Sequence, residues 1–305
     1  MEIKIGPISE REMGFLILLR EGGKMKDLIK RAAEDLIKSA YAIALTGAGI
    51  STESGIPDFR GPSGIWTKDP AAEKRAYQSY EKFRKNPKEY WKERLSGPSL
   101  LGDLRKVMPN PGHYALAELE QIGILQWVIT QNVDNLHQRG GSQKVLDYHG
   151  NAFKLRCVSC HARYDPNVFD LERLNRENQL PPLCKKCNGA IKSDVVHFNE
   201  PIPSDVAERS FEEASQCDLM LICGTSAVVY PFANLPRVAK RRQLEKGIGI
   251  ILIEINAEPT PLTEQKISDY LIQGKTGQVL PQIVEEVKRI GKEYGKLRLG
   301  EKFKL

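Results

Sequence analysis

Short apolar runs that each end in small or polar residues constrain this chain more than any other feature of its sequence. These runs are Tyr41–Thr46, Trp127–Thr130, Asp218–Cys223, Ile250–Ile255 and Tyr270–Ile272. Nearly continuous apolar strands suit a parallel sheet that is covered on both faces. Helical patterns such as His113–Ile122 and Val279–Ile290 separate them, so we expect an α/β fold with a doubly wound parallel sheet. The polar residues after each run would then line a ligand crevice at the carboxyl ends of the strands.

Two regions interrupt this alternation of strands and helices. Residues 61–110 are rich in charged and aromatic residues, proline and glycine, and residues 151–192 hold four of the six cysteines. We expect an N-terminal appendage at 1–26, a Rossmann-like domain from 27–60, 111–150 and 193–305, and a smaller inserted domain from 61–110 and 151–192. Met25 opens a helical pattern, MKDLIKRAAEDLIKSA, so we also expect native translation to begin there.

Composition excludes several classes of protein. With 41% hydrophobic and 28% charged residues, the chain is not globally disordered. The uncharged stretch Leu219–Pro236 contains turn residues, and Phe15–Leu19 is too short for a signal peptide, so we expect no membrane segment and a cytoplasmic location. A formal charge of +6 does not by itself support nucleic-acid binding. The oligomeric state is left open.

Two CxxC pairs predict a metal site. Cys157 and Cys160 are separated by 23 residues from Cys184 and Cys187. Two such pairs can place four thiolates around one zinc ion in a tetrahedron. Four protein ligands leave no position for a reacting water, so we expect a structural zinc ribbon. Cys217 and Cys223 flank a predicted buried strand, and we expect them to pack in the core.

A glycine loop follows the first predicted strand. Gly47 and Gly49 would let backbone N–H groups approach a phosphate. The dehydrogenase fingerprint requires a third glycine where Thr52 stands, and Asp69, at the spacing of its acidic residue, does not follow a strand. The loop therefore indicates nucleotide binding without hydride transfer.

The motifs around this loop are more specific than the loop itself. The run GAGISTESGIPDFRG covers Gly47–Gly61, and further motifs are QNVDNLH (Gln131–His137), YHGN (Tyr148–Asn151) and GTS (Gly224–Ser226). With the two CxxC pairs, in this order from about residue 27 to about 290, the chain resembles the sirtuins, the NAD-dependent protein deacylases.

The resemblance implies a fold and a reaction. The fold is a Rossmann-like domain joined to a smaller domain made of a zinc ribbon and a helical module. The reaction is NAD-dependent protein-lysine deacetylation, which yields nicotinamide, 2′-O-acyl-ADP-ribose and free lysine. NAD is then the co-substrate, one zinc ion is structural, and an acyl-lysine protein or peptide is the partner.

The resemblance also assigns catalytic roles. His149 matches the general base, and imidazole suits a base that titrates near neutrality and reaches a ribose hydroxyl. Asn132 matches the residue that orients the ribose and a water. Asp134 matches the acceptor of hydrogen bonds from the nicotinamide carboxamide. We expect His113 to be structural.

The implied cofactor site spans most of the motifs. In the first motif Ala48 and Gly49 lie against the pyrophosphate, Arg60 adds charge there, and Phe59 shields the anomeric carbon. The expected NAD-binding residues are Gly47, Ala48, Gly49, Thr52, Asp58, Phe59, Arg60, Gln131, Asn132, Val133, Asp134, His149, Gly224, Thr225, Ser226, Asn256 and Lys275.

The lysine tunnel is expected from Val196, Phe198 and His149. The family segment V-x-F-G-E pairs with the substrate backbone, but here His197 and Asn199 replace the usual residues. Asparagine tolerates positive φ, so the turn can persist with a changed rim.

The helical module indicates which acyl groups the protein prefers. Arg94 and Gly97 occupy the positions of the Tyr-x-x-Arg pair that binds acidic acyl groups in the desuccinylase-like branch, so neutral acyl groups are favoured. The alternatives are a deacylase for longer acyl groups, a protein mono-ADP-ribosyltransferase, and a non-enzymatic NAD-responsive binding protein.

Overall fold

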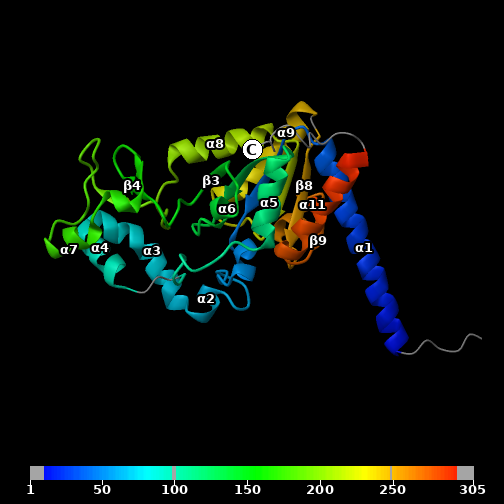
Figure 1. The fold of residues 1–305 in the computed structure, drawn as a ribbon, viewed down its shortest axis with the longest axis horizontal. Coiled ribbons are helices and arrows are strands. Elements are labelled where there is room, and N and C mark those ends of the chain that lie inside the picture. The colour runs from blue at the N-terminus through cyan, green and yellow to red at the C-terminus, as the bar shows by residue number, and fades with distance from the viewer. Residues whose placement is uncertain (1–9, 98–100, 248, 294–305) are drawn as a thin grey trace, which may run out of the picture.

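The larger part of the molecule is built on one six-stranded parallel sheet (Figure 1). The computed structural model describes residues 10–97, 101–247 and 249–293. The strands are β1 (Ala42–Thr46), β2 (Leu125–Thr130), β3 (Val145–Asp147), β7 (Leu219–Cys223), β8 (Ile251–Asn256) and β9 (Tyr270–Gln273). Their order is β3-β2-β1-β7-β8-β9, and every neighbouring pair is parallel. The doubly wound fold expected from the apolar runs is confirmed, and its order reverses between β1 and β7.

Helices cover both faces of this sheet. One face carries α1 (Glu10–Lys38), α5 (Pro111–Gln121) and α11 (Thr276–Glu293), and the other carries α8 (Ser204–Gln216) and α9 (Leu235–Lys246). Residues of β1 alternate between the two cores, since Ala42 and Ala44 face the first while Ile43 and Leu45 face the second. All four are fully buried. Burial on both faces explains why these strands are apolar throughout.

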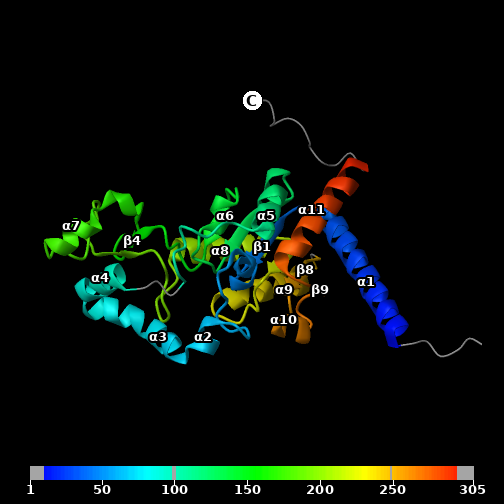
Figure 2. The same cartoon turned by 60° about the horizontal axis from the view of Figure 1, so that its bottom comes forward.

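The first helix extends beyond the sheet. Ile29, Ala32 and Leu36 of α1 are buried against the core, as the pattern that begins at Met25 predicts. The helix starts at Glu10, so the boundary expected after residue 26 falls inside it. Figures 1 and 2 both show its first turns projecting away from the body of the protein.

The smaller part of the molecule combines two insertions. Between β1 and α5 lie α2 (Ile65–Lys68), α3 (Pro70–Lys85) and α4 (Pro87–Ser96). Between β3 and α8 lies an antiparallel sheet, in the order β5 (Arg163–Tyr164), β4 (Leu155–Cys157) and β6 (Ile191–Ser193), with α7 (Leu171–Arg176) beside it. Figure 2 shows both insertions on the same side of the large sheet. Phe83 and Trp91 from the helices share one apolar core with Leu155 and Ile191 from the small sheet.

Local capping explains where the inserted helices begin. Asp69 accepts a hydrogen bond from Ala72 N and is followed by proline at the first helical position of α3. Asn86 caps α4 in the same way, accepting from Glu89 N. Asp69 is therefore a helix cap and lies away from any strand end. No helix in the described part of the chain has both the length and the apolar character needed to cross a bilayer.

Candidate active site

A cleft of about 1570 Å³ lies at the carboxyl ends of the large-sheet strands. The lining includes Ala48, Gln131, Thr225 and Lys275, which follow β1, β2, β7 and β9, and Asn256, which is the last residue of β8. This is the crevice predicted from the polar ends of the apolar runs. The helical insertion and the segment after β6 form its other wall. Every predicted cofactor and substrate residue lines this cleft except Gly47.

The floor of the cleft is a close backbone contact between the glycine loop and the end of β7. Gly49 N donates to Gly224 O at 2.8 Å. A Cβ atom on Gly49 would stand 2.7 Å from that same oxygen, and one on Gly47 would stand 2.6 Å from Thr225 Cβ. Only glycine fits at either position. The resulting bare backbone fits the close approach of a dinucleotide phosphate.

A buried polar network lies beneath the loop. Ser51 Oγ donates to Asp134 Oδ2 at 2.7 Å, and Asn132 Nδ2 donates to Ser51 Oγ and to Gly47 O, both at 3.0 Å. Burial raises the pKa of Asp134, although hydrogen bonds from Leu136 N and Ser51 oppose the rise. The network fixes the Asn132 amide, so its orientation is set before any ligand binds.

Ser51 and His113 join this network although neither was predicted to be a site residue. His113 accepts from Asn110 N at 3.2 Å within the capping box of α5, which is the structural role expected for it. Its other nitrogen lies 3.5 Å from Ser51 Oγ. Burial lowers the pKa of His113 to about 4, so the ring is neutral. The position of Ser51 inside the first motif was the one available signal.

His149 is oriented for proton acceptance. Its Nδ1 lies 3.2 Å from Gln131 O. A carbonyl oxygen can only accept, so Nδ1 carries the hydrogen and Nε2 holds the free lone pair. Burial lowers the pKa of His149 to about 4. The expectation that this base titrates near neutrality therefore does not hold, because desolvation disfavours the imidazolium ion.

The segment after the glycine loop forms an aromatic wall. The Phe59 ring lies 4.8 Å from Trp66, and the Arg60 guanidinium lies 4.5 Å above the same indole. Phe198 lies 5.5 Å from Trp66 and 4.3 Å from Tyr77 of α3. The segment after the glycine loop, the segment after β6 and the helical insertion therefore meet at one aromatic cluster.

At the end of β8, Asn256 is held by a buried carboxylate. Thr225 N donates to Asn256 Oδ1 at 2.9 Å, and Asn256 Nδ2 donates to Glu254 Oε2 at 3.2 Å. Glu254 is fully buried and accepts further bonds from the hydroxyls of Thr260, Thr263 and Ser268. Sequence reasoning missed Glu254, because a glutamate within an apolar run gives no sign of its partners. Gln131 Nε2 donates to Thr225 Oγ1 at 2.7 Å and closes this side of the cleft.

The segment after β6, which was expected to receive the substrate, is bonded to the His149 backbone. Val196 N donates to His149 O at 2.8 Å. Asn199 has φ of 62°, so the prediction that asparagine would preserve the left-handed turn is confirmed. His197 Nε2 lies 2.8 Å from Tyr90 Oη of α4, and Lys192 Nζ pairs with Glu200 at 3.1 Å.

Apolar side chains contribute to the lining of the cleft. They include Leu95 of α4 and also Leu101, Leu104, Ala152, Leu155 and Leu171. Arg94 and Gly97, the residues aligned with the acidic-acyl pair, line the cleft as well. Glu93, also in the lining, forms an ion pair with Lys82.

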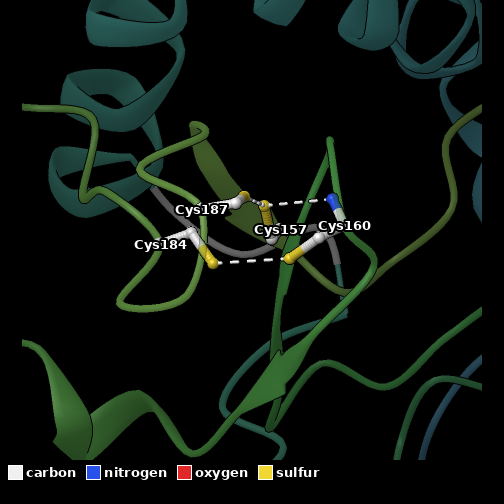
Figure 3. Close-up of side chains that lie close together, drawn as sticks. All are labelled: Cys157, Cys160, Cys184 and Cys187. Atoms are coloured by element: carbon white, nitrogen blue, oxygen red, sulfur yellow. Dashed lines mark hydrogen bonds between the residues drawn. The ribbon is translucent and has the colours of Figure 1, made fainter.

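The four predicted metal ligands converge in the small sheet (Figure 3). Cys157 Sγ lies 3.5 Å from Cys187 Sγ, and Cys160 Sγ lies 3.5 Å from Cys184 Sγ. All four sulfurs lie within 4.8 Å of one another. Tetrahedral zinc with Zn–S bonds of about 2.3 Å needs sulfurs about 3.8 Å apart, so the cluster fits that ion. Ser159 N and Cys160 N both donate to Cys157 Sγ, which suits a thiolate ligand.

Fold and site together define a class of protein. A doubly wound sheet carries a glycine-floored nucleotide cleft and a neutral histidine beside a substrate segment, and an inserted domain holds four clustered thiols. The model of the Sir2 family matches residues 47–231. This chain belongs to the Sir2 family.

Relatives and solved structures agree with this assignment. NAD-dependent protein deacylase 2 of Archaeoglobus fulgidus is 46% identical over 270 residues, which are 88% of this chain and 100% of the relative. NAD-dependent protein deacetylase of Sulfurisphaera tokodaii is 42% identical, over 83% of this chain and 93% of the relative. A Sir2 homologue solved with NAD has a TM-score of 0.66 at 37% identity, covering 85% of this chain and 94% of that one. Sir2Af2 bound to a myristoylated histone peptide has a TM-score of 0.59 at 40% identity, covering 88% and 99%.

Proposed function

We propose that this protein is an NAD-dependent protein-lysine deacetylase that releases nicotinamide, 2′-O-acyl-ADP-ribose and free lysine. The observation that carries the proposal is the setting of His149. Its Nδ1 faces a carbonyl oxygen, its Nε2 is free to accept a proton, and its own backbone oxygen holds the segment that would receive the peptide. The proposal includes a cytoplasmic location and an acyl-lysine protein as partner.

The residues of the cleft would have different roles in this reaction. Bound NAD would supply an electrophilic ribose carbon and a nicotinamide leaving group. Asp134 would accept from the carboxamide, and Asn132 would orient the ribose. His149 Nε2 would take a proton from a ribose hydroxyl, which turns that hydroxyl into a nucleophile. The apolar side chains of Val196 and Phe198 would flank the lysine stem and exclude water.

Replacing the base tests this assignment. His149→Asn should lower NAD-dependent deacetylation of an acetyl-lysine peptide by about 10²- to 10⁴-fold, the usual contribution of a positioned general base. NAD binding, measured by calorimetry, should stay within a few-fold. His161→Asn is the matched control, since His161 is exposed and asparagine tolerates its φ of 59°. Unchanged turnover of His149→Asn, or stable transfer of label from NAD to protein, would overturn the proposal.

A preference for longer acyl groups is a second candidate, favoured by the leucines among the residues that line the cleft. Leucines there could cover an alkyl chain, and the similar Sir2Af2 was solved with a myristoylated peptide. Acetyl-, succinyl- and myristoyl-lysine peptides compared at matched concentration distinguish the candidates by kcat/KM. Neutral acyl groups should be preferred, because the acidic-acyl pair is absent. Preferential desuccinylation would contradict both candidates.

A further inference from the structure

The turn that carries His149 is held from both sides by buried polar contacts. Asp147 precedes the histidine by two residues and Asn151 follows it by two. Asn151 N donates to Asp194 Oδ2 at 3.0 Å, and Asn151 Nδ2 donates to Asn135 Oδ1 at 2.8 Å. Gln138 Nε2 donates to Asp147 Oδ1 at 2.7 Å. Thus both flanks of the turn are tied to neighbouring segments.

A single arginine of the ribbon connects these flanks. Arg163 lies on β5, and its Nη2 pairs with Asp147 Oδ2 at 3.0 Å and also with Asp194. Asp194 has a side chain with no exposed surface, while Asp147 is 9% exposed. Arg163 therefore bridges the residue before the catalytic turn and the residue that anchors the turn's far end.

The opposite charges in this network compensate one another in a buried setting. Two buried carboxylates share the bridging Arg163, and Arg156 Nε donates to Asp194 at 2.6 Å from the opposite side. Burial disfavours the charged guanidinium, but Asp194 and Asp147 outweigh it, so the pKa of Arg163 lies above its ordinary value. Removing the bridge would leave two carboxylates facing each other with less compensation, which favours a shift of the turn.

Arg163 stands apart from the reacting groups. Neither Arg163 nor Asp147 is among the described residues that line the cleft. We therefore expect Arg163 to affect the reaction through the turn that it contacts.

We propose that Arg163 is a positioning residue that fixes His149 by bridging Asp147 and Asp194. The inference rests on the proposed role of His149. The ribbon would then contribute to catalysis through this bridge, in addition to its place in the smaller domain.

The proposal makes a step-specific prediction. In the proposed reaction the acyl oxygen displaces nicotinamide from the ribose carbon before the hydroxyl activated by His149 attacks the acyl carbon. A misplaced base should therefore slow deacylation and spare the earlier step. Arg163→Ala should lower kcat for deacetylation by about 10- to 100-fold, the cost of a small misplacement of a catalytic group. The KM values for NAD and peptide should change less than two-fold, and exchange of labelled nicotinamide into NAD should persist. Arg163→Lys, which keeps the charge but loses the planar fork, should fall between Ala and wild type.

The control is Arg173→Ala, in the same ribbon. Arg173 is exposed, and its ion pair with Glu177 spans 3.9 Å, so this variant removes the same charge without touching the turn. Bound zinc per chain and the melting temperature are measured for all variants. Asp147→Asn offers a second route to the same loss should Arg163→Ala fail to fold.

Two results would overturn the inference. Wild-type kcat in Arg163→Ala would do so while leaving the proposed function intact, provided that His149→Asn is still inactive. Parallel loss of nicotinamide exchange, zinc content and deacetylation would show a purely structural role for Arg163. If instead His149→Asn keeps full activity, the proposed function itself fails.

Discussion

At the scale of single residues, Glu254 shows how a buried group can set a site that it does not touch. A carboxylate can only accept hydrogen bonds, so it directs the Asn256 amide nitrogen inward and leaves the amide oxygen for Thr225 N. Glu254→Gln introduces a donor among four donors, and the loss of one buried bond costs about 1–3 kcal/mol.

We therefore expect Glu254→Gln to raise the KM for NAD by roughly 5- to 150-fold, the range that 1–3 kcal/mol allows, with kcat nearly unchanged. Steady-state kinetics with varied NAD measure this split. Gln131→Glu would not serve as a control because Gln131 lines the cleft, whereas Gln126→Glu changes an exposed amide bond to Gly123 O. A lowered kcat with unchanged KM would contradict the prediction.

Single residues also mark what the sequence could predict. The left-handed turn at Asn199 follows from a local preference of asparagine, so it could be foreseen. The low pKa of His149 and the bridge of Arg163 could not, because both depend on which distant side chains surround a group. A local backbone preference depends on the residue and its sequence neighbours. The desolvation of a side chain and its ion pairs depend on the tertiary structure.

At the scale of elements, the same contrast appears. The five predicted apolar runs became strands, but β3 was missed because three residues are too few to show a period. The cysteine spacing predicted the convergence of the four ligands correctly. The two insertions were expected to form one smaller domain, but the contacts that join them were not predicted, since nothing near Trp91 indicates that its indole donates to Ile191 O at 2.8 Å.

Metal removal should unfold the ribbon selectively. The small sheet has short strands, and apparent zinc-binding free energies of about 10–16 kcal/mol in small zinc modules show how much stability the ion can supply. After chelation, amides of residues 155–193 should exchange hydrogen rapidly, while those of the large sheet remain protected. Exchange measured by mass spectrometry with and without chelator tests this. Equal protection of the ribbon in both samples would show that the ion is dispensable for its fold.

At the scale of the whole molecule, four histidines give the fold a defined response to acid. Burial lowers the pKa of His113 and His149 to about 4, of His197 to about 3, and of His137 well below its ordinary value. The unfolded chain therefore binds more protons than the native one below about pH 6.5. Their contribution to stability is complete above that pH and is lost as the pH falls towards 4.

As the pH falls, each of these histidines should lower the free energy of unfolding by up to about 1.4 kcal/mol per pH unit. Asp134 and Asp147, whose pKa values burial raises, act in the opposite direction at pH values above the ordinary carboxyl pKa. We expect the urea midpoint to be clearly lower at pH 5.5 than at pH 7.5. A midpoint that is equal or higher at pH 5.5 would refute this account.

The order of the elements along the chain has one further consequence. The backbone leaves the large sheet after β1 and returns at α5, then leaves again after β3 and returns at α8. The smaller part is thus tethered by four crossings, so one proteolytic cut at any crossing would leave it covalently attached. Such tethering restricts the two parts to rocking about their common boundary, and the width of the cleft becomes the coordinate along which the molecule can most easily deform.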